Sequence, residues 1–359
     1  MENMRILEII LMVIMPFIFV ALFIPVVKKI ALHIGAMDVP NKRKVHKKPM
    51  PRLGGLGIYA GFLLGYILFG EQTMTMNSIL IGSFILLVTG IIDDIKPIKA
   101  KHKLIGQLIA TLIVVFYGDI LIRDVSFFGL DMVFNYFSYP ITILFILGCI
   151  NCMNLIDGLD GLAGGISSIF FLTIGIIAYF QGRTGLTITL TFIMLGSTLG
   201  FLVHNFNPAK IFMGDSGSMF LGFIISIITI LGFKSIITSS IIVPLCILIV
   251  PILDTLCAIL RRKLKGESIS VPDKSHFHHQ LLRRNFGVKG TVLFIYLITF
   301  LFSTASIIWL LVDIKIGYII YGVLMLLLII FVLKTDIVFE HKQNNSRRNY
   351  EKDRKNRNI

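Results

Sequence analysis

Residues 139–180 read YPITILFILGCINCMNLIDGLDGLAGGISSIFFLTIGIIAYF, and this stretch decides the fold class. Two apolar runs, 139–156 and 162–180, each approach the ~20 residues that a helix needs to cross a hydrocarbon core. Between them lies a short turn with two aspartates and two glycines. Because no charged residue interrupts either run, the stretch predicts two membrane-spanning helices joined by a polar turn.

The rest of the chain repeats this pattern of long apolar runs and short polar loops. Hydrophobic residues make up 55% of the 359 residues and charged residues only 15%, with a mean hydropathy of +0.86. Soluble domains carry about 25% charged residues, so soluble and disordered classes are excluded. The prediction is an all-α, polytopic membrane protein with about eleven transmembrane helices: 6–27, 54–70, 77–92, 104–117, 139–156, 162–180, 186–203, 217–233, 240–260, 291–312 and 316–333.

The basic residues predict how these helices are oriented in the lipid bilayer. Eleven spans place the termini on opposite sides, and the loops on the side of the C-terminus contain 29 of the 34 lysines and arginines. Because basic loops stay in the cytoplasm, the N-terminus is expected outside and the C-terminus inside. Residues 1–333 then form the transmembrane domain, and residues 334–359 form a basic tail without apolar periodicity, which is expected to be disordered.

Five cytoplasmic loops contain more polar residues than a connection requires. The second loop begins with Asp93 and Asp94 at the end of an apolar run, followed by Lys101 and Lys103. Adjacent carboxylates at a membrane border are costly unless a cation accompanies them, and Mg²⁺ favours oxygen ligands. The lysines are spaced to neutralise a phosphate. Two surface acids paired with the lysines are the alternative interpretation.

The third loop has four polar residues at intervals of three. A continuous helix would spread them over half a turn, whereas Gly158 and Gly161 allow the chain to fold back. The loop has no lysine or arginine, so a cation or a polar ligand is expected to compensate its acids. The four residues are Asn151, Asn154, Asp157 and Asp160.

The fourth and fifth loops add an acid and three histidines. Asp215 stands between glycines, where it can approach a metal or ligand closely. His276, His278 and His279 lie among lysines and arginines. A zinc site is one interpretation of such histidines, but no thiolate accompanies them, so contact with phosphate or pyrophosphate is favoured. Just before this loop, Pro244 and Pro251 should kink the ninth span, with Asp254 following at its inner end.

Taken together, the five loops resemble the polyprenyl-phosphate N-acetylhexosamine-1-phosphate transferases, from about residue 25 to residue 300. The order His-Phe-His-His is similar to the N-acetylglucosamine branch, and the phospho-MurNAc-pentapeptide transferases are the alternative. The first loop, residues 28–53, resembles the enzymes that initiate teichoic acid in Gram-positive bacteria. The matching stretches are 43–55, 93–103, 154–163, 207–217 and 272–279.

The resemblance implies a reaction and a cellular location. GlcNAc-1-phosphate would pass from UDP-GlcNAc to undecaprenyl phosphate with release of UMP, at the cytoplasmic face of a bacterial plasma membrane. The reaction would be the first membrane step of a cell-wall glycopolymer such as teichoic acid. Direct attack by the lipid phosphate is favoured, and a covalent aspartyl intermediate stays open. No nucleic-acid partner is expected, and a homodimer stays open.

The resemblance also implies roles for individual residues. Mg²⁺, with Mn²⁺ as a substitute, would bind Asn154 and Asp215. Asp93 or Asp94 would orient or deprotonate the lipid phosphate. The catalytic set is Asp93, Asp94, Asp157 and Asp160, the last two helping to hold the uridine end. The substrate-binding set is Lys47, Arg52, Lys101, Lys103, Asn151, His276, His278 and His279.

A secondary transporter is the alternative from a different class of protein. Transporters place their ionisable sites near the middle of the bilayer, often between repeats. Here the distinctive acids lie at one face and no repeat is visible, which favours an enzyme.

Overall fold

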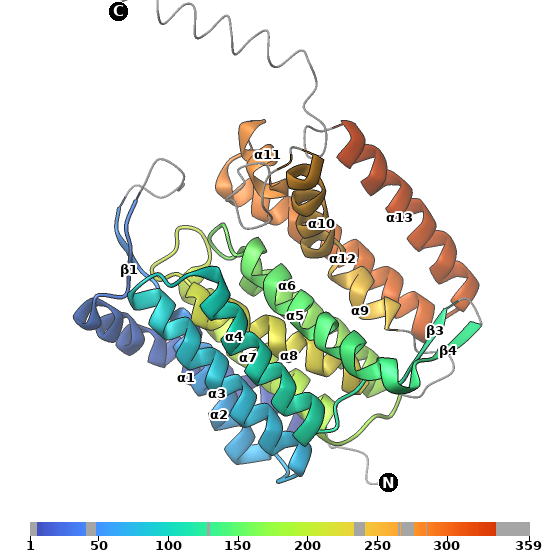
Figure 1. Cartoon of the computed structure of the whole chain (residues 1–359), viewed down its shortest axis with the longest axis horizontal. Coiled ribbons are helices and arrows are strands. Elements are labelled where there is room, and N and C mark those ends of the chain that lie inside the picture. The colour runs from blue at the N-terminus through green and yellow to red at the C-terminus, as the bar shows by residue number, and fades with distance from the viewer. Residues whose placement is uncertain are drawn as a thin grey trace, which may run out of the picture.

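The computed structural model of the protein describes residues 6–40, 48–127, 130–232, 241–264, 266, 276–284 and 286–334, which form a bundle of helices (Figure 1). A π-helical turn, Ile113–Tyr117, extends α4 (Ala100–Leu112), and a 3₁₀ turn, Asn135–Phe137, precedes α5 (Ser138–Ile156). The helices are α1 (Ile6–Ile34), α2 (Gly54–Phe69), α3 (Met74–Ile95), α4 (Ala100–Leu112), α5 (Ser138–Ile156), α6 (Leu162–Phe180), α7 (Leu186–Asn205), α8 (Gly214–Gly232), α9 (Ile242–Ile247), α10 (Ile249–Leu264), α11 (Phe277–Arg283), α12 (Val288–Leu311) and α13 (Ile314–Lys334).

The helix lengths confirm a polytopic helical membrane protein. Within the described residues, nine helical segments are long and apolar enough to cross a membrane, and α2 is a shorter apolar helix of 16 residues. The predicted ninth span is divided into α9 and α10 at Leu248, so the expected kink is present. Pro251 lacks the N–H that would bond to the carbonyl of Ile247, which explains the break. The count of eleven spans and their orientation stay predictions.

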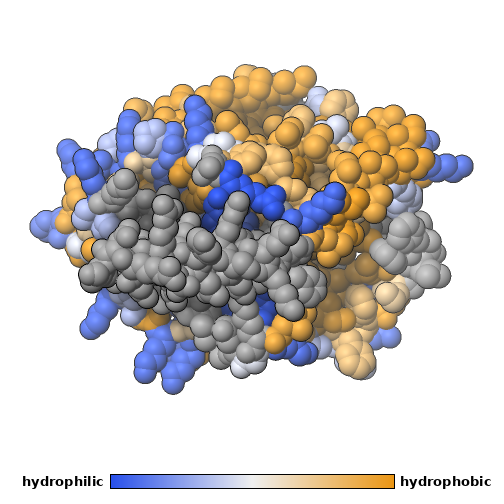
Figure 2. All heavy atoms as spheres, turned by 90° about the horizontal axis from the view of Figure 1, so that it is seen from above, coloured by the Kyte–Doolittle hydropathy of each residue, from blue (hydrophilic) through white to orange (hydrophobic). Residues whose placement is uncertain are grey.

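Two short antiparallel hairpins were not part of the all-α prediction. The first pairs β1 (Met37–Asp38) with β2 (Met50–Pro51), and the second pairs β3 (Asp124–Phe127) with β4 (Leu130–Val133). Figure 1 shows β1 and α11 at one end of the bundle and the β3–β4 hairpin at the other. Seen from above, hydrophilic side chains lie mainly along the left and lower edges and in a strip near the centre, whereas apolar side chains cover most of the top and right (Figure 2).

Backbone hydrogen bonds join the loop before α2 to the loop before α8. The Phe212 N–H donates to the Pro51 carbonyl at 2.8 Å, and the Gly54 N–H donates to the Phe212 carbonyl at 2.9 Å. Arg52 and Phe212 form an isolated β-bridge. This pairing carries the Arg52 side chain to the beginning of α8.

Helix α8 lies at the centre of the bundle, where it packs against α2, α3 and α5. A Cβ atom added to Gly55 would lie 2.1 Å from the Gly217 nitrogen, and one added to Gly90 would lie 2.3 Å from the Ser216 Cα. Small residues at such contacts let helix backbones approach closely inside a membrane. The first turn of α8 is therefore held between the backbones of α2 and α3.

A proline in α1 creates a polar contact with α7. Pro25 has no N–H, so the Ala21 carbonyl lacks its usual helical donor. The His204 imidazole on α7 supplies one, with Nε2 at 2.8 Å from the Ala21 oxygen. Inside a membrane an unsatisfied carbonyl is costly, so this bond helps to hold α7 against α1.

Candidate active site

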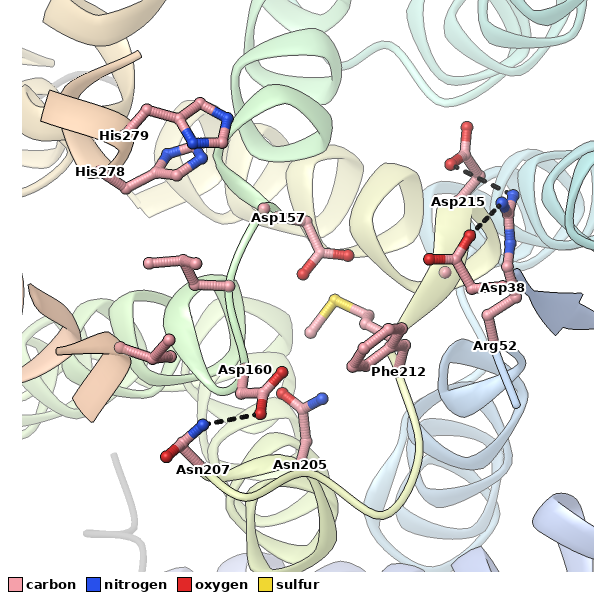
Figure 3. A pocket seen from close by; sticks show the side chains of 15 residues that line it. Asp38, Arg52, Asp157, Asp160, Asn205, Asn207, Phe212, Asp215, His278 and His279 are labelled. Atoms are coloured by element: carbon pink, nitrogen blue, oxygen red, sulfur yellow. Dashed lines mark hydrogen bonds and ion pairs between the residues drawn. The ribbon is translucent and has the colours of Figure 1, made fainter. Parts of the chain in front are cut away.

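A cavity of about 430 Å³ is formed by loops and helix ends from five parts of the chain. Figure 3 shows Arg52, Asp38 and Asp215 on one side of it and His278 and His279 on another. The residues that line it are Asp38, Arg52, 157–160, Asn205, Asn207, 212–215, His278, His279 and Val288. Residues from four of the five predicted loops thus meet here, and the second loop contributes the side chains that pair with Arg52 and Asp215.

Three carboxylates gather beside this cavity, and we call Asp93, Asp94 and Asp215 the carboxylate cluster. Their ligand atoms all lie within 4.8 Å of one another, with Asp93 and Asp94 buried in the last turn of α3 and Asp215 in the first turn of α8. Arg52 Nη2 lies 3.1 Å from Asp93 and 3.0 Å from Asp94. Lys103 Nζ lies 2.9 Å from Asp93 and 2.5 Å from Asp215.

The Asp94 carboxylate anchors the beginning of α8. It accepts hydrogen bonds from the backbone N–H groups of Asp215 at 2.9 Å and Ser216 at 3.1 Å, and from the Ser216 hydroxyl at 2.7 Å. Arg52 Nε donates to it at 3.0 Å. A carboxylate at a helix N-terminus satisfies unpaired N–H groups and interacts favourably with the helix dipole. Gly214 adopts a left-handed conformation, with φ of 76°, and a Cβ atom at this position would lie only 2.4 Å from Asp94 Oδ2.

The charges around the cluster suit a divalent cation. Asp38 adds a fourth carboxylate, 3.5 Å from Arg52 Nη1. Four carboxylates against Arg52 and Lys103 leave two negative charges in excess. Carboxylate oxygens are the ligands that hard divalent ions prefer. Among the described residues this is the one group of three or more acids, histidines or cysteines close enough to share a metal ion, so the zinc interpretation of the histidines gains no support.

Asp157 ends α5 and faces the cavity (Figure 3). Burial, followed by the nearby carboxylates of Asp215 and Asp94, raises the pKa of Asp157 to about 8. At neutral pH its carboxyl group is therefore mainly protonated and can donate a hydrogen bond.

Asp160 holds the loop between α7 and α8. Its Oδ2 accepts hydrogen bonds from Asn207 Nδ2 at 2.9 Å and from the Ala209 N–H at 3.0 Å. Asn205 makes a parallel connection, because its Oδ1 accepts from the Gly161 N–H at 3.0 Å. These contacts join the third predicted loop to the fourth.

The two asparagines of the third loop point elsewhere. Asn151 Nδ2 donates to Gln107 Oε1 at 3.0 Å and to the Leu147 carbonyl at 2.7 Å. Asn154 Nδ2 donates to Ser218 Oγ at 2.9 Å, three residues after Asp215 on α8. Neither asparagine is among the described residues that line the cavity. The run of four polar residues is therefore divided between the helix contacts and the cavity.

His278 and His279 form one side of the cavity, which we call the histidine wall. Their ring centroids are 4.3 Å apart. A Cβ on Gly158 would lie 2.5 Å from His278 Nε2, so this ring rests against the backbone of the third loop. His278 is 2% exposed, and its Nδ1 has no hydrogen-bond partner in the described structure. Burial, followed by the charge of His279, lowers the pKa of His278 to about 3, so the ring is neutral.

The remaining predicted residues lie in different positions. His276 is buried behind the histidine wall, and Lys101 is exposed in the first turn of α4; neither is among the described residues that line the cavity. Lys47 lies outside the described residues.

Sequence reasoning assigned no role to several residues that line the cavity. These residues belong to the same loops as the predicted site residues, and their polar side chains are the feature that could have identified them. They are Asp38, Asn205 and Asn207.

Comparisons with known proteins show the family of this chain. Residues 76–233 match Glycosyl transferase family 4. The "Probable undecaprenyl-phosphate N-acetylglucosaminyl 1-phosphate transferase" of Bacillus subtilis (strain 168) is 43% identical over 86% of this chain and 87% of its own length. The "Decaprenyl-phosphate N-acetylglucosaminephosphotransferase" of Mycolicibacterium smegmatis is 30% identical over 76% of this chain and 74% of its own. The Escherichia coli (strain K12) "Undecaprenyl-phosphate alpha-N-acetylglucosaminyl 1-phosphate transferase" is 29% identical over 81% of both. The chain therefore belongs to Glycosyl transferase family 4.

Proposed function

We propose that the protein transfers N-acetylglucosamine 1-phosphate from UDP-N-acetylglucosamine to undecaprenyl phosphate and releases UMP. A lipid phosphate oxygen attacks the phosphorus next to the sugar, and the bond from that phosphorus to the UMP oxygen breaks. One phosphoanhydride replaces another, so the step needs positioning and charge neutralisation more than chemical driving force. The names of the relatives support undecaprenyl phosphate as the acceptor and N-acetylglucosamine 1-phosphate as the transferred group.

The observation that carries the proposal is the position of the carboxylate cluster. It lies at the ends of apolar helices, beside a polar cavity and next to two cationic side chains. A lipid-borne phosphate can reach this level from the bilayer, and a nucleotide sugar can enter the cavity from water. A transporter would instead place its acids near the middle of the bilayer.

Within the cluster, Asp93 and Asp94 are suited to different tasks. The four acceptor positions of Asp94 are used by Arg52 and the first turn of α8. Asp93 Oδ2 faces the cations Lys103 and Arg52, which would also bind an incoming phosphate. Asp93 is therefore our candidate for contacting and deprotonating the lipid phosphate.

We assign Mg²⁺ to the carboxylate cluster, with Mn²⁺ as a substitute. When bound, the cation would neutralise pyrophosphate charge. Asp215 would hold it at the beginning of α8. Asn154, the second ligand expected from the sequence, is on α5. It contacts Ser218, which lies about one helical turn after Asp215 on α8.

The nucleotide sugar is assigned to the cavity between the cluster and the histidine wall. The volume of about 430 Å³ falls within the range of small-ligand sites. Neutral His278 can donate a hydrogen bond to a pyrophosphate oxygen, as can His279 in either protonation state, and protonated Asp157 can donate to a carbonyl of the base.

The cellular assignment is a cytoplasmic active site in the plasma membrane, in the first step of a teichoic acid or similar polymer. Lys99 and Asp119 are exposed at opposite ends of α4 and its π-helical extension. In a protein without its native cysteines, cysteines at 99 and 119 should react with impermeant reagents from the inside and the outside, respectively. Labelling of both from one side would refute this topology.

The decisive assay is UMP release by the purified protein. With UDP-GlcNAc and undecaprenyl phosphate, UMP and a lipid-linked sugar pyrophosphate should form, and omission of either substrate should stop both. A panel of UDP-sugars that includes UDP-GalNAc tests the sugar. Equal UMP formation without the lipid would contradict the proposal.

A further inference from the structure

A buried acid outside the cavity contacts the helix that carries the histidine wall. Asp254 lies on α10 and is 1% exposed. Its Oδ2 accepts a hydrogen bond from His276 Nδ1 at 3.0 Å, and its Oδ1 accepts from the Phe277 N–H at 2.6 Å. The two oxygens therefore have separate partners, a side chain and the first N–H of α11.

Within the described part of the chain, His276 is the basic side chain that pairs with Asp254. A buried carboxylate that loses a hydrogen-bond partner is left unsatisfied, which is unfavourable. Because a carboxylate only accepts hydrogen bonds, His276 must keep a proton on Nδ1. The contact thus fixes both the orientation and the tautomer of the ring.

The His276 ring in turn packs on the histidine wall. The rings of His276 and His278 are almost parallel, with centroids 5.8 Å apart and an interplanar angle of 6°. His278 also rests against Gly158, so its ring is confined between His276 and the third loop. The order of contacts runs from Asp254 through His276 to His278. Of the three histidines of the fifth loop, His278 and His279 are among the described residues that line the cavity and His276 is not.

We infer that Asp254 is a positioning residue that acts through His276 to hold the histidine wall toward the nucleotide sugar. This inference rests on the proposed function, because Asp254 would position residues of the proposed nucleotide-sugar site from outside the cavity. It also divides the three histidines, which the sequence grouped together, into one supporting residue and two that face substrate.

Asp254→Asn separates this role from simple helix capping. An asparagine Oδ1 still accepts from the Phe277 N–H, so the cap remains, but the amide cannot accept from His276 Nδ1 with the same geometry. Loss of a partner that orients a metal-bound histidine typically costs 10–100-fold in metal affinity or activity, and the same kind of orienting contact is lost here. We therefore expect kcat/KM for UDP-GlcNAc to fall by about 10–100-fold, while the Mg²⁺ concentration for half-maximal activity stays unchanged.

A double-mutant cycle tests whether Asp254 acts through His276. The amide of asparagine at 276 can turn either its donor or its acceptor toward residue 254, so Asp254→Asn should cost little more in a His276→Asn protein. Asp313→Asn is the matched control, because Asp313 accepts from N–H groups in the first turn of α13. Activity of Asp254→Asn within twofold of the wild type would overturn the inference, as would effects that multiply in the double variant.

The wild-type protein provides a test that does not require a variant at Asp254 to fold. In ¹⁵N-histidine-labelled protein, solid-state NMR should show a protonated Nδ1 signal that disappears in His276→Asn. Protonation at Nε2 alone would contradict the inference. If the wild type releases no UMP from UDP-GlcNAc, the proposed function fails; if it is active and Asp254→Asn equals it, the positioning role alone fails.

Discussion

The carboxylate cluster and the histidine wall face the same cavity but are built on opposite principles. The cluster is charged, and its acids are paired with Arg52 and Lys103 at 2.5–3.1 Å. The histidine wall is neutral at His278, whose Nδ1 has no partner in the described structure. The cluster is fixed by α3 and α8, whereas the wall depends on a helix of seven residues.

This difference indicates how the site divides its work. Paired acids at helix ends keep a fixed field for a cation and a phosphate, which suits a step controlled by electrostatic positioning. An unpaired nitrogen has hydrogen-bonding capacity that a substrate can use. Substitutions in the carboxylate cluster should therefore lower kcat, and substitutions in the histidine wall should lower kcat/KM for the nucleotide sugar.

The largest effect is expected at the centre of the cluster. Asp215→Asn keeps the side-chain size but removes one negative charge, so phosphate charge loses its compensation, which is worth several kcal/mol. We expect kcat to fall by about 10³-fold or more. Asp119→Asn, at an exposed acid paired with Arg123, is the control. Turnover near the wild-type rate with unchanged Mg²⁺ dependence would show that Asp215 holds no metal.

A smaller loss is expected at the histidine wall. His278→Ala and His279→Ala should each lower kcat/KM for UDP-GlcNAc by about 10²-fold, because donors in a water-poor site gain strength as charge develops. Zinc chelators should have no effect, whereas removal of Mg²⁺ should stop turnover. Zinc bound stoichiometrically and lost in these variants would replace this interpretation with a zinc site.

Asp157, between the two regions, should give the ligand-free protein a distinctive pH dependence. Its folded-state pKa is about 8, whereas an unfolded aspartate titrates near 4, so the folded state binds more protons between these values. Stability contributed by the protonated group is therefore lost as pH rises toward 8, by at most about 1.4 kcal/mol per pH unit. When thermal unfolding is measured at several pH values in the presence of EDTA, the stability of Asp157→Asn should change less with pH than that of the wild type. An equal slope in both proteins would contradict the assignment.

The smallest effect is expected at the hydrogen bond between His204 on α7 and the Ala21 carbonyl on α1. His204→Ala leaves the Ala21 carbonyl without a donor and should lower the unfolding free energy by about 1–3 kcal/mol. In a Pro25→Ala protein the restored N–H replaces that donor, so the same change should cost less. Thermal unfolding in detergent measures both, with exposed His33→Ala as the control. Equal losses in the two backgrounds would show that the hydrogen bond is not what stabilises this contact.

The membrane helices were predictable because apolar runs and helix-breaking residues are local properties of the chain. The α9–α10 break follows from Pro251, and the turn after α5 follows from Gly158 and Gly161. The β1–β2 hairpin was missed because two-residue strands have no periodicity. Its pairing with Phe212, which delivers Arg52 to α8, depends on contacts far apart in the sequence.

The candidate site was predicted as a set of loops but not as a geometry. The loop motifs contain Asp93, Asp94 and Asp215, and the structure brings these three together. The sequence could not show that Asn151 faces Gln107, because that contact depends on how α4 packs against α5. The partner of His276 was equally hidden, since Asp254 is 22 residues away on a different helix.

The position of α8 at the centre of the bundle has a consequence for the lipid around the protein. Sixteen of its 19 residues are buried, whereas α13 buries only Gly317, Tyr321 and Leu328. A thicker or thinner bilayer acts first on helices that touch lipid, by changing their tilt. We therefore expect outer helices such as α13 to adapt to hydrophobic mismatch while Asp215 keeps its place, so that turnover should depend little on the acyl-chain length of the host membrane.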